Sequence, residues 1–252
     1  MEEIESSDRK IKNGKSPGID RLPIEFIKQR IHIINFDLCK IFNYILCRQS
    51  YPEYWGKGLR VVIPKGNNDI RPITIEPVFA KILETIMDQR LNFVNEVFKK
   101  TDHYNGGFLK GSRVQDNILI LTSCIQKQLS LGKNLYVSFV DFKKAFNFVN
   151  HNILIYKLLK HGMSGRYINL LKDMYSKIKG VVKVNQKIYE TIVDECGTNQ
   201  GGPLSPNIFR LMLADLKEYF DVNFGIKMDD EILVHLLWAD DLVLIANTPE
   251  GL

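Results

Sequence analysis

The spacing of apolar residues predicts mainly helices in the first half of the chain. Apolar residues recur at three- and four-residue intervals from Ile24 to Ile45, and the same spacing returns in residues 80–99 and 115–131. The first stretch predicts two helices or one bent helix, and the other two predict one helix each. Residues 1–20 are charged and interrupted by Gly and Pro, which indicates a partly ordered leader before the first helix.

Extended segments alternate with these helices. Residues 58–63 and 70–74 flank a basic turn rich in Gly and Asn, which predicts a β-hairpin, and residues 180–194 predict a second one. Residues 135–142 are almost continuously apolar and β-favouring, so we expect a buried strand there. The next segment predicts a helix whose inner face includes Phe146, Val149, Ile153 and Tyr156.

The C-terminal third predicts two further helices and a last hairpin. Residues 165–178 have helical spacing, and Ser205 followed by Pro206 is typical of a helix start, with the helix expected to reach Phe220. Two apolar strands follow, and they meet at Ala239-Asp240-Asp241. The whole pattern predicts an α/β protein.

The adjacent acids Asp240 and Asp241 are the first candidate site. They lie at a turn between strands of Leu, Ile and Val, where a carboxylate needs solvent, a cationic partner or a metal. In an arbitrary sequence, a polar hairpin tip is the commoner explanation. Asp141 also ends an apolar strand, so three acids could converge at one edge of a sheet. Such a group could hold two Mg²⁺ ions about 3.5–4 Å apart for phosphoryl transfer, as in a nuclease or a polymerase.

The composition of the chain indicates its cellular compartment more clearly than its activity. Hydrophobic residues make up 45% of the 252 residues and charged residues 25%, and the formal net charge is +5, a mild lean toward polyanionic partners. The four cysteines form no C-x-x-C pair and no zinc-ligand spacing with the histidines, which favours a reduced protein. There is no signal-peptide core and no apolar run near ~18 residues. We therefore expect an intracellular protein of the nucleus or cytoplasm that is neither secreted nor membrane-spanning.

Six blocks in order resemble the reverse transcriptases of non-LTR (LINE-type) retrotransposons. Any one of them is a weak signal, but together they run in register from Asn13 to Ala246. They read NGKSPGIDRLPIEFIK, DIRPITIEPVFAKILETIMDQRL, GGFLKGSRVQDNILIL, FVDFKKAFNFVNH, NQGGPLSPNIF and WADDLVLIA. The resemblance implies an RNA-directed DNA polymerase that uses an RNA template, a DNA primer, dNTPs and two Mg²⁺ ions, with Mn²⁺ as an alternative.

The resemblance also implies roles for single residues. Asp141 and Asp240 match the acids that bind both metals, Asp241 matches a more variable third acid, and the backbone carbonyl of Phe142 would complete a metal shell. Phe146 matches the aromatic gate under the incoming sugar, which excludes a 2′-hydroxyl; plain core packing is the alternative explanation.

Three further residues match the family's dNTP-binding positions, and a fourth is a candidate beside them. Arg71 matches the arginine that binds the triphosphate, where a guanidinium could hold phosphate oxygens with two hydrogen bonds. Lys65 is a candidate companion, although a lysine in such a turn is often only a solvated charge. Gln200 and Gly201 match the loop against which the templating pair and the sugar rest.

Two residues depart from the family pattern. Trp238 stands where a Tyr is usual, and Asn147 stands where an Asp is common, so a local pairing could be weakened. Neither change removes an expected metal ligand.

The implied fold is the fingers and palm of a right-hand polymerase, with an antiparallel palm sheet backed by helices. We expect residues 1–45 to form the leader and first helices, and residues 46–252 the reverse transcriptase domain, with fingers at about 46–134 and palm at about 135–252. The chain ends at Leu252, so the thumb is expected to be missing. A catalytically weak retroelement remnant that only binds nucleic acid is therefore the alternative to a working polymerase core. A two-metal nuclease accounts for the acids but not for the other blocks.

Overall fold

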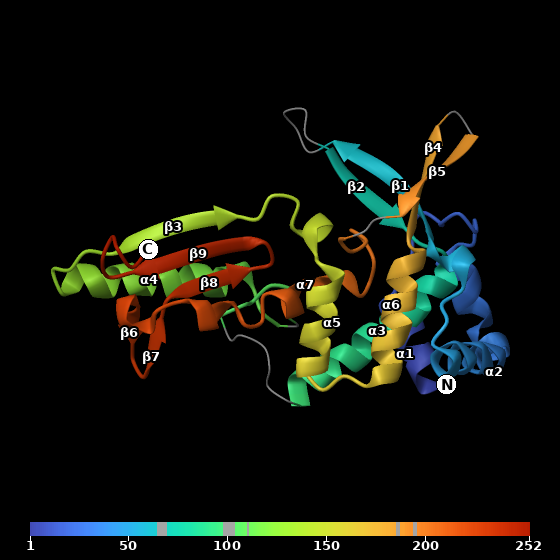
Figure 1. The fold of residues 1–252 in the computed structure, drawn as a ribbon, viewed down its shortest axis with the longest axis horizontal. Helices are drawn as coiled ribbons and strands as arrows, with labels where there is room; N and C mark the ends of the chain where they lie inside the picture. The colour runs from blue at the N-terminus through green and yellow to red at the C-terminus, as the bar shows by residue number, and fades with distance from the viewer. Residues whose placement is uncertain (65–69, 98–103, 110, 185–186, 194–195) are drawn as a thin grey trace. The chain divides into compact units, whose positions relative to one another are not determined.

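The structure is a computed structural model with a mixed α/β fold and small sheets (Figure 1). It describes residues 1–64, 70–97, 104–109, 111–184, 187–193 and 196–252. The chain divides into two compact units, and neither is continuous in sequence. The first comprises residues 1–98 and 146–208, and the second residues 99–145 and 209–252.

Most of the helices belong to the first unit. They are α1 (Glu2–Lys10), α2 (Ile24–Arg48), α3 (Val78–Val97), α5 (His151–Lys160), α6 (Gly165–Lys177) and the first turn of α7 (Ser205–Met212), with a 3-10 turn at Glu53–Gly56. The apolar spacing predicted α2, α3 and α6 correctly, and α2 is a single helix. Helix α3 contributes Ile82, Leu83, Met87 and Leu91, which are all completely buried.

The N-terminal segment is a helix where a partly ordered leader was expected. Acids occupy the first turn of α1 and bases the last, which matches the helix dipole. Arg90 of α3 donates two hydrogen bonds to the Glu3 carboxylate, at 2.9 and 2.7 Å, and Ile4 is buried. Tertiary contacts that the local sequence pattern does not reveal therefore order residues 2–10.

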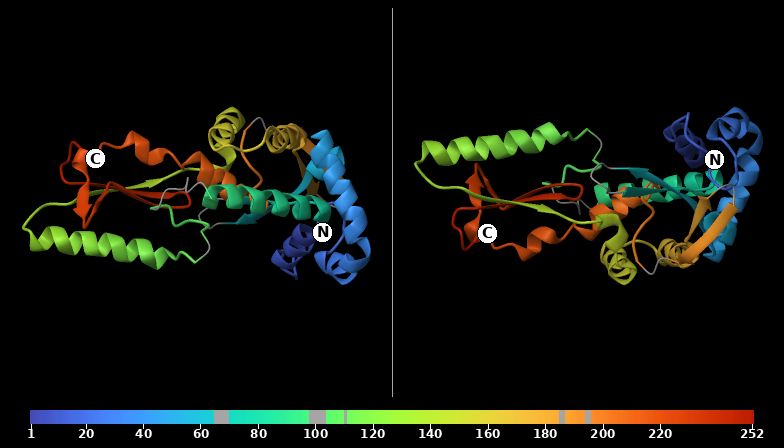
Figure 2. Two further views of the ribbon diagram at one scale, coloured as in Figure 1. Left: turned by 90° about the horizontal axis from the view of Figure 1, so that it is seen from below. Right: turned by 90° about the horizontal axis from the view of Figure 1, so that it is seen from above.

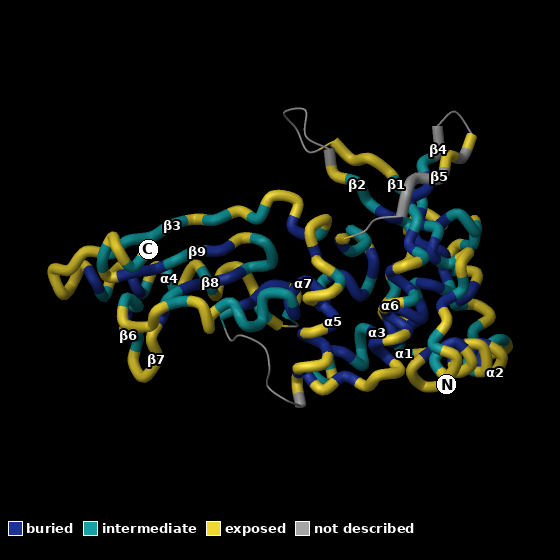
Figure 3. The backbone as a smooth tube through the Cα atoms, in the orientation of Figure 1, coloured by how far each residue is buried: buried dark blue, intermediate teal, exposed yellow. Residues whose placement is uncertain are grey.

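The two predicted hairpins of the first unit join into one four-stranded sheet. The order is β2-β1-β4-β5, with β1 (Lys57–Pro64) antiparallel to β2 (Ile70–Ile75) and β4 (Lys179–Val184) antiparallel to β5 (Lys187–Val193). Strands β1 and β4 pair in parallel, which the separate hairpin patterns did not indicate. The outer half of β1 is exposed on both faces (Figure 3).

The second unit contains the three-stranded antiparallel sheet β3-β9-β8. Its strands are β3 (Tyr136–Asp141), β9 (Asp241–Ala246) and β8 (His235–Trp238). Helix α4 (Val114–Ser130) lies along one face and the segment after α7 lies along the other, as both views in Figure 2 show. That segment holds 3-10 turns at Leu216–Tyr219 and Val222–Phe224, followed by the hairpin β6 (Ile226–Met228) and β7 (Glu231–Leu233). The core between α4 and the sheet consists of Cys124, Ile226, Leu233, Leu236 and Ile245.

Three further expectations, for β3 and for the segments after β3 and at α7, were wrong. Strand β3 is an edge strand rather than a buried one, since β9 pairs with only one of its edges, and Phe139 is 74% exposed. The helix after β3 is split into a 3-10 turn, Ala145–Phe148, and α5, so Ile153 and Tyr156 point outward while Leu154 and Leu158 are buried. Helix α7 ends at Met212 rather than at Phe220.

None of the helices among the described residues combines the length and the apolar character needed to cross a bilayer.

Candidate functional site

Two of the three candidate acids face each other across β3 and β9. The strand register places Asp141 opposite Asp241, and both residues are exposed. Directly opposite residues of an antiparallel pair have Cβ atoms roughly 4.5–5.5 Å apart on one face of the sheet. The end of the sheet therefore carries two neighbouring carboxylates, although the two residues are distant in sequence.

The third acid, Asp240, lies in the tight turn between β8 and β9. Trp238 pairs with Asp241, so only Ala239 and Asp240 form the turn. Ala239 has a φ of 58°, a left-handed conformation that is unusual for a residue with a side chain and costs about 1–3 kcal/mol. The backbone N–H of Phe142 donates to the carbonyl of Asp240 at 3.3 Å. The turn, the end of β3 and the Phe142 backbone thus meet at one point.

A glycine-containing loop supports this turn from the free edge of β8. The N–H of Leu237 donates to the Tyr104 carbonyl at 2.9 Å, and the N–H of Gly106 donates to the Leu237 carbonyl at 3.1 Å. A Cβ on Gly107 would lie 2.2 Å from the Ala239 nitrogen, which is impossible without displacing the backbone. In the sequence, Gly106 and Gly107 begin the third of the six blocks. The adjacent pair of glycines was the signal that another backbone approaches closely.

Asp141 and Asp241 line a largely apolar cavity of about 510 Å³ beside the sheet. Its other walls come from Val114, Ile118 and Phe139, and Trp238 lines it beside the acids. Asn117 of α4 donates to the Leu237 carbonyl at 3.1 Å and so ties the helix to the strand that enters the turn. Asp141 and Asp241 therefore have solvent on one side and an apolar wall on the other.

The donor set fits a hard divalent cation, but the side chains are not arranged as a completed site. Mg²⁺ prefers carboxylate and carbonyl oxygens, and like charges directly opposite each other in a sheet are destabilising unless a cation intervenes. Among the described residues, however, no three His, Cys, Asp or Glu side chains are grouped closely enough to hold a metal ion. The structure therefore brings Asp141 and Asp241 together and leaves Asp240 beside them in the turn.

The first unit contains the predicted Gln-Gly loop, held against β2. The N–H of Thr74 donates to the Gln200 carbonyl at 2.8 Å. Gly201 has a φ of 111°, and a Cβ there would lie 3.0 Å from the Thr74 carbonyl oxygen, so glycine is required on two grounds. Gln200 itself is half-buried.

The other expected dNTP contacts of this unit are spread over separate elements. Arg71 is exposed on β2, opposite Ile63 of β1, and Lys65 lies outside the described residues. Phe146 is half-buried in a 3-10 turn rather than on an amphipathic helix, and its carbonyl accepts from the Thr198 N–H at 2.8 Å. This hydrogen bond connects Phe146 to the segment that precedes Gln200.

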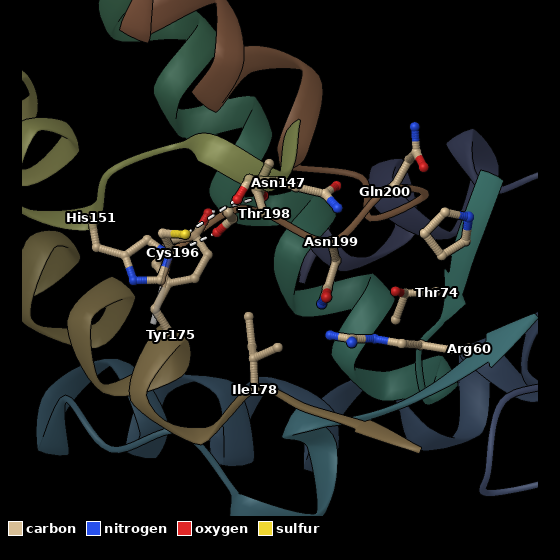
Figure 4. A pocket seen from close by; sticks show the side chains of 12 residues that line it. Arg60, Thr74, Asn147, His151, Tyr175, Ile178, Cys196, Thr198, Asn199 and Gln200 are labelled. Atoms are coloured by element: carbon tan, nitrogen blue, oxygen red, sulfur yellow. Dashed lines mark hydrogen bonds between the residues drawn. The ribbon is translucent and has the colours of Figure 1, made fainter. Parts of the chain in front are cut away.

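Side chains from α5 and α6 fix the segment that enters the Gln-Gly loop (Figure 4). His151 stacks on Tyr175 with ring centroids 4.3 Å apart, and its Nε2 lies 2.7 Å from the Gly197 carbonyl oxygen. Tyr175 donates to the Thr198 hydroxyl at 3.1 Å, and burial raises the Tyr175 pKa, so this hydroxyl stays protonated. Together with Arg60, Thr74 and Gln200 these residues surround a cavity of about 220 Å³. Asn147, the departure from the family pattern, is exposed at its edge, and its carbonyl accepts from the Cys196 thiol.

Comparison with known families and proteins gives one consistent result. Residues 63–252 match the family described as "Reverse transcriptase (RNA-dependent DNA polymerase)". The chain is 29% identical over 217 residues to the R2 retrotransposon polyprotein of Nasonia vitripennis, covering 84% of this chain and 21% of that protein. It is 22% identical to the RNA-directed DNA polymerase of the mobile element jockey of Drosophila melanogaster, covering 98% of this chain and 27% of the relative. The chain thus spans only about a fifth to a quarter of these relatives.

The fold resembles that of telomerase. A structure of apo telomerase from Candida tropicalis, truncated from its C-terminal domain, superimposes with a TM-score of 0.57 at 13% identity, covering 96% of this chain and 53% of the telomerase chain. A second structure from that organism, in complex with a fragment of telomeric RNA, gives a TM-score of 0.55 at 15% identity, covering 86% and 40%. At this identity the likeness concerns the fold alone.

Proposed function

This chain belongs to the reverse transcriptase family, and on that premise we propose that it forms the core of an RNA-directed DNA polymerase. It would extend the 3′-hydroxyl of a primer with dNTPs on an RNA template. The observation that carries this proposal is the register of β3 and β9, which pairs Asp141 with Asp241 and leaves Asp240 in the adjoining turn. The three-stranded sheet with α4 would then be part of the palm and the β1–β2 hairpin part of the fingers, with the boundaries near residues 46 and 135 remaining predictions.

The three aspartates and the Phe142 carbonyl would hold two Mg²⁺ ions, or Mn²⁺ in their place. Bound there, the ions would supply charge stabilisation for phosphoryl transfer and activate the primer hydroxyl. The exposed carboxylates of Asp141 and Asp241 support this assignment, because no ion pair to either is found among the described residues. The tight turn and the Gly107 contact would limit how far Asp240 can move.

The residues of the first unit would bind the incoming nucleotide. Arg71, with Lys65 as a companion, would hold the triphosphate through charge-assisted hydrogen bonds. Phe146 would pack under the sugar and exclude a 2′-hydroxyl. Gln200 and Gly201 would support the templating pair through a backbone segment that the Thr74 hydrogen bond already fixes.

Primer extension on an RNA template tests this proposal. The assay would use the chain alone and, in parallel, the chain joined to the segment that follows the matched region in a relative such as the R2 protein. We expect product that requires Mg²⁺ and is lost on chelation. If the joined chain makes no such product while the intact relative does, the polymerase proposal fails.

A second candidate function is nucleic-acid binding without catalysis. The exposed face of α2 favours this function, because three aromatic rings there each have the cationic group of a neighbouring Lys or Arg side chain over them. Arg30 lies 4.2 Å from the Phe26 centroid, Lys40 lies 3.9 Å from that of Phe36, and Arg48 lies 5.6 Å from that of Tyr44. Bases stack on aromatic rings and phosphates attract such cations. RNA binding that weakens with salt, without any dNTP incorporation, would support this reading over the first.

A further inference from the structure

Two buried glutamates lie directly beneath the Gln-Gly loop. Glu76 follows β2 and Glu84 lies on α3, and they are only 2% and 4% exposed. Their carboxyl groups lie side by side, next to the same position on Gly202, and each acts electrostatically on the other. Two buried ionised carboxylates in contact would repel strongly, and a hydrogen bond between them requires that one of the two carries a proton.

The glutamate pair is in direct contact with the loop. The Asn199 side chain donates to Glu76 Oε1 at 2.8 Å. A Cβ on Gly202 would lie 2.8 Å from Glu76 Oε1 and 3.2 Å from Glu84 Oε2, so both carboxyl groups occupy the space that a side chain at residue 202 would need. The pair thus holds Asn199 by a hydrogen bond and adjoins Gly202, while the Gln200 carbonyl is held by β2.

The second carboxyl oxygen of Glu76, Oε2, is a buried acceptor that lacks a hydrogen-bond donor among the described residues. A buried acceptor without a donor is costly. A carboxyl proton on Glu84 is a donor that the site itself can supply.

Burial is the main reason why the pair keeps that proton, and the surrounding charges act in both directions. Lys81 of α3 is the cation that acts on both carboxyl groups, whereas Asp88 on the same helix opposes ionisation of Glu84. The nearby hydroxyls of Tyr51 and Tyr175 are neutral, because burial raises the pKa of each. Burial also raises the pKa of Glu76 to about 7 and that of Glu84 well above its ordinary value.

We propose that Glu76 and Glu84 share one proton and that the protonated pair is the positioning element for the Gln200-Gly201 loop. Loss of the proton would place two carboxylates in contact, with one lysine to balance them. Their separation would break the Asn199 hydrogen bond and loosen the turn from Asn199 to Gly202. The consequence for dNTP binding rests on the proposed polymerase function, whereas the shared proton itself does not.

The first test needs no activity. A ¹³C NMR titration of glutamate carboxyl carbons in the full chain should show one carboxyl group that stays protonated to neutral pH or above. Glu84→Gln should remove this signal, and Glu96→Gln, which changes an exposed glutamate of the same helix, should leave it in place. If every glutamate of the wild-type chain titrates in the ordinary acid range, the proposal is overturned, even if Glu84→Gln fails to fold.

The second test measures positioning. Between about pH 6 and about pH 9 the wild-type KM for dNTP should rise roughly tenfold with kcat much less affected, a factor equivalent to about 1.4 kcal/mol. Glu84→Gln keeps a hydrogen-bond donor and cannot ionise, so its KM should stay low and nearly constant. Glu84→Ala should have a high KM at every pH. Equal pH dependence of KM in the wild type and Glu84→Gln would refute the positioning role.

A chain that makes no product would defeat the polymerase proposal but not this one. Hydrogen exchange of the amides of residues 197–202, corrected for the intrinsic effect of pH, then replaces KM as the readout. Protection should fall in the wild type as pH rises and persist in Glu84→Gln. Protection that is independent of pH in both chains would count against the shared proton as the positioning element.

Discussion

Carboxylates placed opposite each other in a sheet are a liability unless a cation lies between them. Asp141 and Asp241 are in that position at the end of the β3–β9 ladder, and Asp240 adjoins them. The same unit contains a natural comparison, because Asp229 and Asp230 are also adjacent acids, exposed at the tip of the β6–β7 hairpin. The first set has a third acid on a neighbouring strand, which distinguishes a candidate metal site from a polar turn.

Replacing either proposed principal ligand should abolish polymerisation. Asp141→Asn and Asp240→Asn remove a charge without changing side-chain volume, so we expect at least about a hundredfold loss in primer extension. The measurement is the initial rate in saturating Mg²⁺. Asp230→Asn is the matched control and should retain the wild-type rate. Retained activity in the Asp141→Asn chain would contradict the assignment.

The glycine of the Gln-Gly loop allows a second test at the residue scale. Gly201→Ala introduces both an unfavourable φ and a contact with the Thr74 carbonyl, whereas Gly14→Ala introduces only the unfavourable φ, since nothing lies within 4 Å of its Cβ. Each should lower the free energy of unfolding, by about 1 kcal/mol for Gly14→Ala and by more, about 2–3 kcal/mol, for Gly201→Ala. Chemical denaturation measures both. Equal losses would show that the contact with β2 adds nothing.

At the scale of elements, the edge of β8 is closed by loop 104–107 rather than by another strand. Two backbone hydrogen bonds to Leu237 and the close approach of Gly107 to Ala239 hold the hairpin turn in place. The turn needs such support because Ala239 has a left-handed backbone. The glycine pair therefore helps to set the position of Asp240 without contributing a side chain.

Gly107→Ala should consequently displace the hairpin turn. The added methyl group would overlap the Ala239 backbone, and a displacement near 1 Å at a reacting centre can cost up to about a hundredfold in rate. We expect primer extension to fall at least tenfold, by the same reasoning. Gly165→Ala is the control, since its φ is ordinary and nothing lies within 4 Å of the added carbon. Unchanged extension by Gly107→Ala would show that the loop does not position the turn.

At the scale of the whole molecule, the buried glutamates link folding to pH. The folded pKa values of Glu76 and Glu84 are raised, so the contribution of the pair is fully present below the unfolded value near 4.5. It is lost as pH rises through the folded pKa values, which are about 7 for Glu76 and well above the ordinary value for Glu84. A rise of the Glu76 pKa from 4.5 to about 7 corresponds to a decrease of roughly 3 kcal/mol in the free energy of unfolding between acid pH and pH above 7. The molecule should therefore be less stable in mild alkali than in mild acid as far as this pair is concerned.

Thermal or urea unfolding of the wild type and Glu84→Gln across this range measures the effect. As pH rises, the free energy of unfolding of the wild type should fall more than that of Glu84→Gln. The reason is that the variant has lost one of the two coupled ionisations. Glu96→Gln should follow the wild type. A constant difference between wild type and Glu84→Gln would mean that the pair does not govern this pH dependence.

Several elements follow from signals that are local in the sequence. The apolar spacing of α2, α3, α4 and α6, the two hairpins and the last strand pair all follow from side-chain periodicity and turn chemistry, which neighbouring residues decide. The ordered blocks likewise identified the family that the comparison confirms. The candidate acids were found in the same way, since each ends an apolar strand.

Which of these parts contact one another follows from long-range packing, and local patterns do not reveal it. The register of β3 on β9, the parallel pairing of β1 with β4 and the docking of α1 on α3 join segments far apart in the chain, and no local pattern specifies them. The same holds for Glu76 and Glu84, which the sequence places on a strand end and a helix with no sign that they touch. Burial and contact depend on the whole chain packing at once, so the partners of a residue appear only in the folded molecule.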